Sequence, residues 1–205
     1  MIDETLSDKI DELLKGCPPV LLAIDGDCAS GKSTLAERLR KRHDCNVISM
    51  DHFFLRPEQR TTERLAEPGG NVDYERFFAE VLTPLKRGES FTYKPFNCQT
   101  GDFSAPITVK PRKLSIVEGA YSLHPSLADA YHIRVFLTVD PAEQLKRIAA
   151  RNGPEMLARF RDEWIPMEKR YFAHFDIADQ CDFVGAISNR PQANGARPYD
   201  GDVAN

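Results

Sequence analysis

Nine consecutive residues, with glycine at the first and sixth positions, combine small side chains with one lysine and several polar groups. They are Gly26-Asp27-Cys28-Ala29-Ser30-Gly31-Lys32-Ser33-Thr34. Glycine at positions 26 and 31 permits backbone dihedrals that a side chain resists, so that successive amide N–H groups can turn around an anion. The spacing Gly-x4-Gly-Lys-Ser is a complete Walker A motif, which indicates a loop that binds the phosphates of a nucleotide.

Each part of this loop has an expected role in binding ATP and Mg²⁺. We expect Lys32 to reach the β- and γ-phosphates, Ser33 to ligate Mg²⁺ through its hydroxyl, and Thr34 to contact a phosphate. A following helix adds partial positive charge at its N-terminus. The remaining ATP-binding positions are expected to be Gly26, Asp27, Cys28, Ala29, Ser30 and Gly31. The alternative, a glycine-rich turn that binds nothing, gives no reason for a Lys-Ser pair at these positions.

The loop lies between a buried strand and a helix, which is the context that this motif requires. An apolar run over 20–24 precedes it, and leucines at helical spacing follow up to about residue 43. Similar short runs, rich in β-branched residues, lie at 46–50, 113–117 and 133–139. Their alternation with helical segments predicts an α/β fold of the P-loop NTPase type. This is a three-layer sandwich in which helices cover both faces of a mostly parallel sheet.

Four of the predicted strands are followed by, or end in, a carboxylate: Asp25, Asp51, Glu118 and Asp140. Because the carboxyl ends of parallel strands share one rim of the sheet, all four are candidates for ligand binding. Asp140 precedes a proline, and we expect it chiefly to cap a helix. Asp25 lies directly before the first loop glycine, where it can hold either the loop or the Mg²⁺ shell.

Asp51 and Glu118 are the carboxylates that we single out for chemistry. Phosphoryl transfer needs an aligned hydroxyl, a group that accepts its proton, and neutralisation of the moving charge. Asp51 is followed by an aromatic pair that could shield it from water and raise its basicity. Glu118 is followed by glycine, which permits close approach of substrate or hydrated Mg²⁺. The alternatives are a helix cap for Asp51 and a buried, paired structural acid for Glu118.

Arginines cluster on both sides of a break in the helical pattern near the C-terminus. Helices are expected over 141–151 and 156–172, separated at Asn152-Gly153-Pro154. The arginines are Arg147, Arg151, Arg159 and Arg161. We expect the segment 147–161 to form a mobile lid that closes over the phosphates. For any single arginine, a solvated helix face is the alternative.

The segment between the second and third predicted strands is an insertion, about residues 55–110, that we expect to bind the phosphate acceptor. It contains a helical pattern over 73–85 and a hairpin over 91–109 around Thr100-Gly101-Asp102. We expect residues 1–185 to form one domain. Residues 186–205, rich in Asn, Pro, Gly and Ala, are expected to be a flexible tail.

Composition argues against several classes of partner. There are 27 Lys plus Arg against 31 Asp plus Glu, and this net charge of −4 argues against a nucleic-acid partner. No run of about 18 apolar residues predicts a membrane span, and the first 15 residues do not resemble a signal peptide. Five scattered cysteines without a Cys-x-x-Cys spacing suggest reduced thiols and a cytoplasmic location. A homo-oligomer is compatible with this composition.

Beyond the loop, three segments make the chain resemble the uridine kinase family. They are Ser49-Met50-Asp51-His52-Phe53-Phe54, Asn71-Val72-Asp73-Tyr74 and Val117-Glu118-Gly119. The resemblance runs from about residue 20 to residue 184. It places the chain near the wider group that contains phosphoribulokinase, pantothenate kinase and nicotinamide riboside kinase.

The resemblance implies an ATP- and Mg²⁺-dependent kinase acting on a small-molecule acceptor, with a uridine-type nucleoside as first candidate. Asp51 resembles the base that takes the 5′-hydroxyl proton, and Asp73 the acid that holds the ribose hydroxyls. Glu118 resembles the carboxylate on the Mg²⁺ side. Arg147 resembles a ribose or phosphate contact, and Arg151 resembles a lid arginine over ATP.

The hairpin departs from the family pattern where acceptor specificity is set. Phe96 and Asn97 stand where Tyr and Asp are expected, and no His follows. Because hydrogen-bonding sites discriminate strongly, nicotinamide riboside and pantothenate stay alternative acceptors. Phe96 could stack on a base or belong to the hairpin core, and Arg161 is a further candidate substrate contact. A non-kinase P-loop switch is the alternative class, against which the lack of an Asn-Lys-x-Asp segment counts.

Overall fold

A five-stranded sheet forms the centre of the computed structural model, which describes residues 2–16 and 19–187. The strand order is β2-β7-β1-β8-β9, and every adjacent pair is parallel. The strands are β1 (Val20–Gly26), β2 (Cys45–Ser49), β7 (Leu114–Glu118), β8 (Ile133–Leu137) and β9 (Phe183–Gly185). Four of them were predicted, while β9, at three residues, was too short to give a strand pattern. The predicted α/β fold with a parallel sheet is confirmed.

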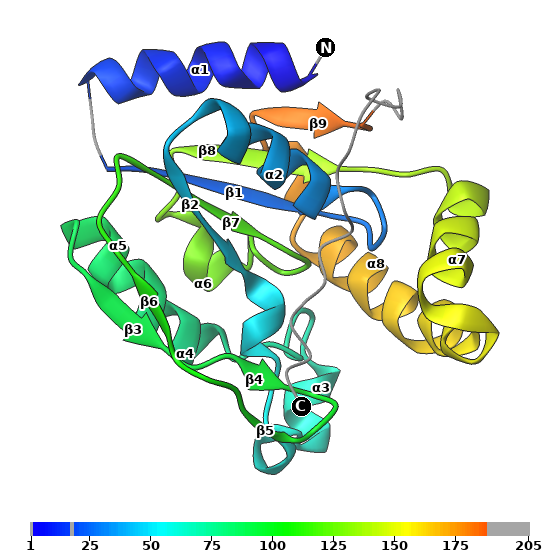
Figure 1. Cartoon of the computed structure of the whole chain (residues 1–205). Coiled ribbons are helices and arrows are strands. Elements are labelled where there is room, and N and C mark those ends of the chain that lie inside the picture. Colours follow the sequence, from blue (N-terminus) through cyan, green and yellow to red (C-terminus); the bar gives the residue numbers. More distant parts are fainter. Residues whose placement is uncertain (1, 17–18, 188–205) are drawn as a thin grey trace.

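Helices cover both faces of this sheet and create two separate cores (Figure 1). Successive residues of β1 point to opposite faces, so that Leu22 and Ile24 belong to one core and Leu21 and Ala23 to the other. The first core is closed by α1 (Ile2–Gly16) and α2 (Lys32–Arg42). The second is closed by residues of α4 (Tyr74–Phe77), α6 (Pro125–Ala128) and α8 (Ile165–His174). Burial on both faces explains why β1 begins with a continuous apolar run over 20–24.

The insertion between β2 and β7 lies on the side of the sheet away from α1 (Figure 1). Its helical part comprises η1 (Met50–Phe53), η2 (Pro57–Gln59), α3 (Thr62–Ala66), α4, the π-helix η3 (Phe78–Leu82) and α5 (Thr83–Arg87). The predicted hairpin is present as two antiparallel pairs. The outer pair is β3 (Phe91–Tyr93) with β6 (Ile107–Val109), and the inner pair is β4 (Phe96–Asn97) with β5 (Asp102–Phe103).

The predicted break between the C-terminal helices is present. Within α7 (Pro141–Arg159), Gly153 has non-helical dihedrals, with φ of 80° and ψ of 171°, so two helical stretches meet at a kink there. Pro154 lacks an N–H, so it fits the first turn of the resumed helix. A π-helix, η4 (Phe160–Trp164), then joins α7 to α8, and η5 (Ile177–Gln180) leads to β9.

Of the predicted tail, residues 188–205 lie outside the described part of the structure. Ile187, at its start, is buried in the same core as α1 and α2. In the part of the chain that the structure describes, no helix has the length and apolarity needed to cross a bilayer.

Gly26 joins the sheet to the loop that follows β1. It pairs with Leu137 of β8, and its φ of 130° belongs to a region that side chains rarely occupy. A Cβ atom at this position would overlap the carbonyl oxygen of Leu137. The same carbonyl accepts a hydrogen bond of 2.9 Å from the Asp27 N–H, so the end of β1 and the start of the loop are fixed on β8.

Gly26→Ala is therefore expected to lower the free energy of unfolding by about 2–4 kcal/mol, because backbone strain and overlap act together. Gly16→Ala is the matched control, since no atom lies within 4 Å of a Cβ placed there. It should change stability by less than about 1 kcal/mol. Urea unfolding followed by circular dichroism compares the two variants, and equal stabilities would contradict this role for Gly26.

Candidate active site

The loop between β1 and α2 curves so that its backbone can surround an anion. Its non-glycine residue Ala29 has a φ of 59°, and Gly31 has a φ of 101°. Alternation of right- and left-handed residues creates a concave set of amides, which is the backbone arrangement of an anion nest. The hydroxyl of Ser30 is buried and, among the described residues, has no hydrogen-bond partner. A phosphate oxygen would give this donor a partner, so the loop fits the group that its motif implies.

Lys32 is folded over the loop that precedes it. Its Nζ donates to the carbonyl oxygens of Gly26 and Asp27, both at 2.8 Å, and the residue is 9% exposed. Ser33 and Thr34, by contrast, are exposed in the first turn of α2. The ammonium group is therefore held at the loop by bonds that phosphate oxygens can replace.

Asp25 lies beneath the loop and is completely buried. Its Oδ1 accepts from the N–H groups of Gly26 at 2.7 Å and Tyr121 at 3.1 Å. Its Oδ2 accepts from the Leu123 N–H at 2.9 Å and the Tyr171 hydroxyl at 3.0 Å. Burial raises the pKa of Asp25 in spite of these donors. Of its two predicted roles, the contacts match the one in which Asp25 holds the loop.

Three side chains from separate elements converge beside the loop. The Ser33 hydroxyl donates to Glu118 Oε2 at 3.0 Å, which links α2 to the end of β7. Burial, and then the nearby Asp51 carboxylate, raise the pKa of Glu118. The absence of a side chain at Gly119 leaves room for the Asp51 carboxylate next to the end of β7, since a Cβ placed there would lie 3.4 Å from Asp51 Oδ1. A hydroxyl and carboxylates are the oxygen donors that Mg²⁺ prefers, so this donor set fits Mg²⁺.

Side chains from α7 and α8 contact the first half of the loop, and these contacts were not predicted from the sequence. Lys169 Nζ lies 2.7 Å from Asp27 Oδ1, and the Cys28 N–H donates to Glu168 Oε2 at 2.9 Å. Gln144 Nε2 donates to the Cys28 carbonyl at 3.0 Å. Glu168 and Gln144 are buried although both are polar, and each lies more than 110 residues from the loop in sequence.

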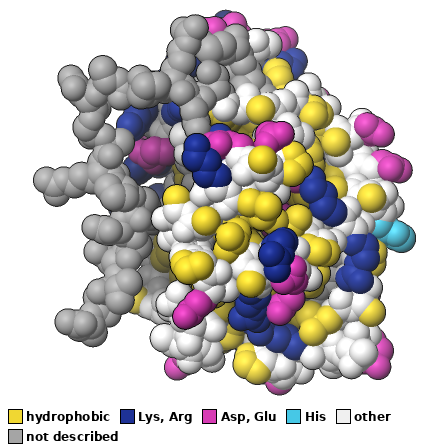
Figure 2. Space-filling view, turned by 90° about the vertical axis from the view of Figure 1, so that its right-hand side faces the viewer, with side chains coloured by type: hydrophobic (Ala, Val, Ile, Leu, Met, Phe, Trp, Pro, Cys, Tyr) yellow, Lys and Arg dark blue, Asp and Glu magenta, His cyan; other side chains and the backbone are white. Residues whose placement is uncertain are grey.

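The predicted lid arginines take different positions. Arg147 touches the loop, because its Nη1 donates to the Ala29 carbonyl at 3.0 Å while its Nε donates to Glu143 at 2.9 Å. Arg151 is exposed and its Nε donates to Asn152. Arg161 is exposed and pairs with Asp162 at 2.7 Å. The face that carries α7 and α8 shows basic and acidic side chains interspersed, which agrees with such pairing (Figure 2).

The predicted acceptor residues are engaged in contacts within the protein. Asp73 is 4% exposed, and its Oδ1 caps α4 by accepting from the Arg76 N–H at 3.0 Å. Its Oδ2 accepts from Gln59 Nε2 at 2.8 Å. Phe96 is 5% exposed and packs edge-on against Phe103. Contact of either side chain with an acceptor would therefore require Gln59 or the hairpin to move.

Arg76 connects η1 to the hairpin and was not among the predicted site residues. Its guanidinium lies 4.0 Å from the ring centre of Phe53, and it donates to the carbonyls of His52 and Lys94. His52 Nδ1 is also 3.0 Å from the hydroxyl of Tyr93. These contacts fix the segment that carries Asp51 against the hairpin.

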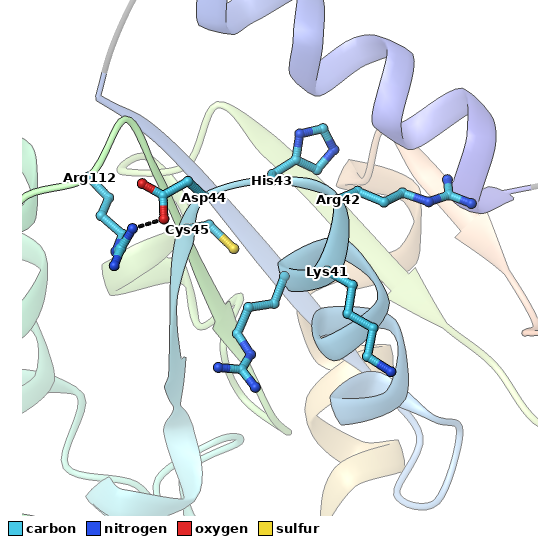
Figure 3. A pocket seen from close by; sticks show the side chains of 7 residues that line it. Lys41, Arg42, His43, Asp44, Cys45 and Arg112 are labelled. Carbon is cyan, nitrogen blue, oxygen red and sulfur yellow. Dashed lines mark ion pairs between the residues drawn. The ribbon is translucent and has the colours of Figure 1, made fainter. Parts of the chain in front are cut away.

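A hollow of about 330 Å³ lies at the other end of the sheet from the loop (Figure 3). It is lined by Arg40, Lys41, Arg42, His43, Asp44, Cys45 and Arg112. Asp44 pairs with Arg112, and the side chains of Lys41 and Arg42 point away from that pair (Figure 3). The three basic residues in the last turn of α2 offset the negative end of the helix dipole. This hollow is therefore not part of the candidate active site.

The Asp25 contacts predict different results for two buried tyrosines. Tyr171→Phe removes a donor to a buried carboxylate and should lower the free energy of unfolding by about 1–3 kcal/mol. The hydroxyl of Tyr131 has no hydrogen-bond partner among the described residues, so Tyr131→Phe should change stability by less than about 1 kcal/mol. Chemical denaturation of both variants measures the difference, and an equal loss would exclude the Asp25 bond as its cause.

Sequence comparisons relate the chain to known kinases. No protein-family model matches the chain. A Schizosaccharomyces pombe protein named "Putative uridine kinase C227.14" is 30% identical over 191 residues, which cover 82% of this chain and 80% of that protein. The phosphoribulokinase of Synechocystis is 30% identical over 111 residues, which cover 51% of this chain and 33% of the longer relative. The chain thus matches a third of the length of phosphoribulokinase.

Solved structures share the fold at lower sequence identity. A structure described as a possible uridine kinase from Bacillus stearothermophilus has a TM-score of 0.65 and 20% identity, with 88% of this chain and 99% of that chain covered. A Silicibacter structure described as a "putative fructose transport system kinase" has a TM-score of 0.69 and 24% identity, with 90% of this chain and 98% of that chain covered. The 30% identity to the Schizosaccharomyces pombe relative, over most of both chains, shows that this chain belongs to the uridine kinase and phosphoribulokinase family of P-loop kinases.

Proposed function

We propose that this protein transfers the γ-phosphate of ATP to a hydroxyl group of a small metabolite, with Mg²⁺ as cofactor. The observation that carries the proposal is the convergence of Ser33, Glu118 and Asp51 beside the anion nest formed by residues 26–34. Oxygen donors for Mg²⁺ (Ser33 and Glu118), a carboxylate that can accept a proton (Asp51) and backbone amides for phosphate thus lie together. Phosphoryl transfer needs little more from a protein than this positioning and charge neutralisation.

The roles of the nucleotide-side residues follow from their contacts. The loop amides and Lys32 bind the phosphates, and Lys32 exchanges its bonds to the carbonyls of Gly26 and Asp27 for phosphate oxygens. Ser33 and Glu118 hold Mg²⁺, which when bound neutralises phosphate charge. Arg147, already at the loop, and Arg151 belong to the lid over 147–161 and contact the nucleotide when it closes.

On the acceptor side, Asp51 takes the proton of the attacking hydroxyl. Of the two carboxylates beside the Ser33 hydroxyl, Asp51 is exposed, whereas Glu118 is buried and bonded to Ser33. The insertion over 55–110 binds the acceptor, with Asp73 on its hydroxyl groups and Phe96 and Arg161 as further contacts. Asp73 is bonded to a neutral amide, Gln59, rather than only to cations, and a sugar hydroxyl can replace that amide as donor.

A uridine-type nucleoside is the first candidate acceptor, supported by the names of the Schizosaccharomyces pombe relative and of the Bacillus structure. Nicotinamide riboside and pantothenate are alternatives, because the hairpin differs from the family pattern at Phe96 and Asn97. The Asn97 side chain accepts from the N–H groups of Gln99 and Thr100, so it shapes the hairpin turn. We further propose a cytoplasmic setting, in which the four described free cysteines stay reduced.

Two substitutions separate nucleotide binding from transfer. Lys32→Ala should reduce phosphate transfer at least about 1,000-fold and weaken ATP binding. Asp51→Asn should reduce transfer about 100- to 10,000-fold and leave ATP affinity within about twofold, because only the proton acceptor is lost. Asp44→Asn, at the far end of the sheet, is the matched control and should have no effect.

The measurement is ATP consumption with uridine, nicotinamide riboside, pantothenate and ribulose 5-phosphate, combined with calorimetric titration of ATP. Undiminished transfer by Asp51→Asn would remove that residue as base. If none of the acceptors supports consumption above the background of ATP hydrolysis, the proposed acceptor class is wrong.

Asp73 and Asp140 both cap helices, which allows the proposed acceptor contact to be separated from capping. Each carboxylate accepts from backbone N–H groups at the start of its helix. Asp73→Ala and Asp140→Ala should each cost about 1 kcal/mol of stability, but only Asp73→Ala should raise the acceptor KM, by tenfold or more. An unchanged KM in Asp73→Ala would restrict Asp73 to its structural role.

A further inference from the structure

One backbone N–H group of the loop donates a hydrogen bond to a side-chain carboxylate of the protein itself. Glu168 Oε2 accepts the Cys28 N–H at 2.9 Å, and Glu168 is 6% exposed. Gln144 on α7 supports this contact by donating to the carbonyl and the sulfur of Cys28, at 3.0 and 3.2 Å. An anion nest that is meant for phosphate thus contains an acidic side chain of the protein itself.

The groups that face Glu168 come from each element packed around it. The charge of Lys32 on α2 favours the ionised form of Glu168, whereas the charge of Asp25 at the end of β1 disfavours it. The thiol of Cys28 and the hydroxyl of Tyr121, which follows β7, are the other titratable neighbours. On α8 itself, Lys169 is paired with Asp27. Lys32 is therefore the main cation that offsets a negative charge on Glu168.

A bound triphosphate changes this balance. Its oxygens compete for the same Lys32 ammonium and bring further negative charge to the loop that Glu168 contacts. An ionised Glu168, which is buried, would then face added repulsion. A protonated Glu168 avoids this repulsion, and its carbonyl oxygen can still accept the Cys28 N–H.

Starting from the proposed binding of ATP, we propose that Glu168 is a positioning residue that takes up a proton from solvent when the loop binds the triphosphate. ATP binding and proton uptake are then linked. Burial raises the pKa of Glu168 to about 7 in the ligand-free protein, so both forms are populated near neutral pH. The added negative charge of ATP shifts the group further toward its protonated form.

Calorimetric titration of Mg-ATP between pH 6.5 and 8.5 tests this linkage. For the native protein, Kd should rise with pH above about 7, approaching tenfold per pH unit, because one proton is taken up per ATP. Glu168→Gln retains an oxygen that accepts the Cys28 N–H but cannot ionise. This variant should bind ATP with nearly constant affinity across the range, at the level the native protein reaches at low pH.

Glu37→Gln is the control, since Glu37 pairs with Arg40 on the exposed side of α2 and should leave the native pH dependence unchanged. Titration of the native protein at pH 7.5, in two buffers of different ionisation heat, counts the protons directly and does not require any variant to fold. Proton uptake supports the proposal. Zero uptake, or the native pH dependence persisting in Glu168→Gln, overturns it, whereas failure of the native protein to bind ATP would overturn the proposed function instead.

Discussion

A buried carboxylate at the end of the central strand organises this protein. Asp25 gathers N–H groups from the loop and from the segment after β7, together with the hydroxyl of Tyr171 on α8. Because a buried carboxylate is costly without donors, these three segments are held together at one point. The loop, the acidic end of β7 and the helix that carries Glu168 and Lys169 are thereby fixed relative to one another.

The order of strands in the parallel sheet brings the candidate site residues to one rim. β2 and β7 are neighbours, with Ser49 in register with Glu118, so the acids that follow or end these strands emerge on the same rim. β7 also pairs with β1, which delivers the loop to that rim. At this rim Glu118 is buried beside Ser33, whereas Asp51 is exposed. This difference is the basis for our proposal that Glu118 lies on the metal side and Asp51 on the acceptor side.

Local sequence patterns predicted the features that depend on neighbouring residues. The loop, four strands, the hairpin and the capping role of Asp140 follow from glycine spacing, apolar runs and turn residues. The pattern did not reveal β9, whose few residues are specified by pairing with β8. It also missed Glu168, Gln144 and Arg76, since a polar residue on a helix looks solvent-exposed until distant segments cover it. The bonds that occupy Asp73 are likewise invisible without the position of Gln59.

We propose that residues 26–34 bind a nucleoside triphosphate next to the Ser33–Glu118 pair. A crystal structure of the protein with Mg²⁺ and a non-hydrolysable ATP analogue tests this proposal. We expect phosphate oxygens on the loop amides, Lys32 Nζ moved from the carbonyls to a phosphate, and Mg²⁺ beside Ser33 and Glu118. An analogue bound elsewhere, with Lys32 still bonded to the Gly26 and Asp27 carbonyls, would contradict it.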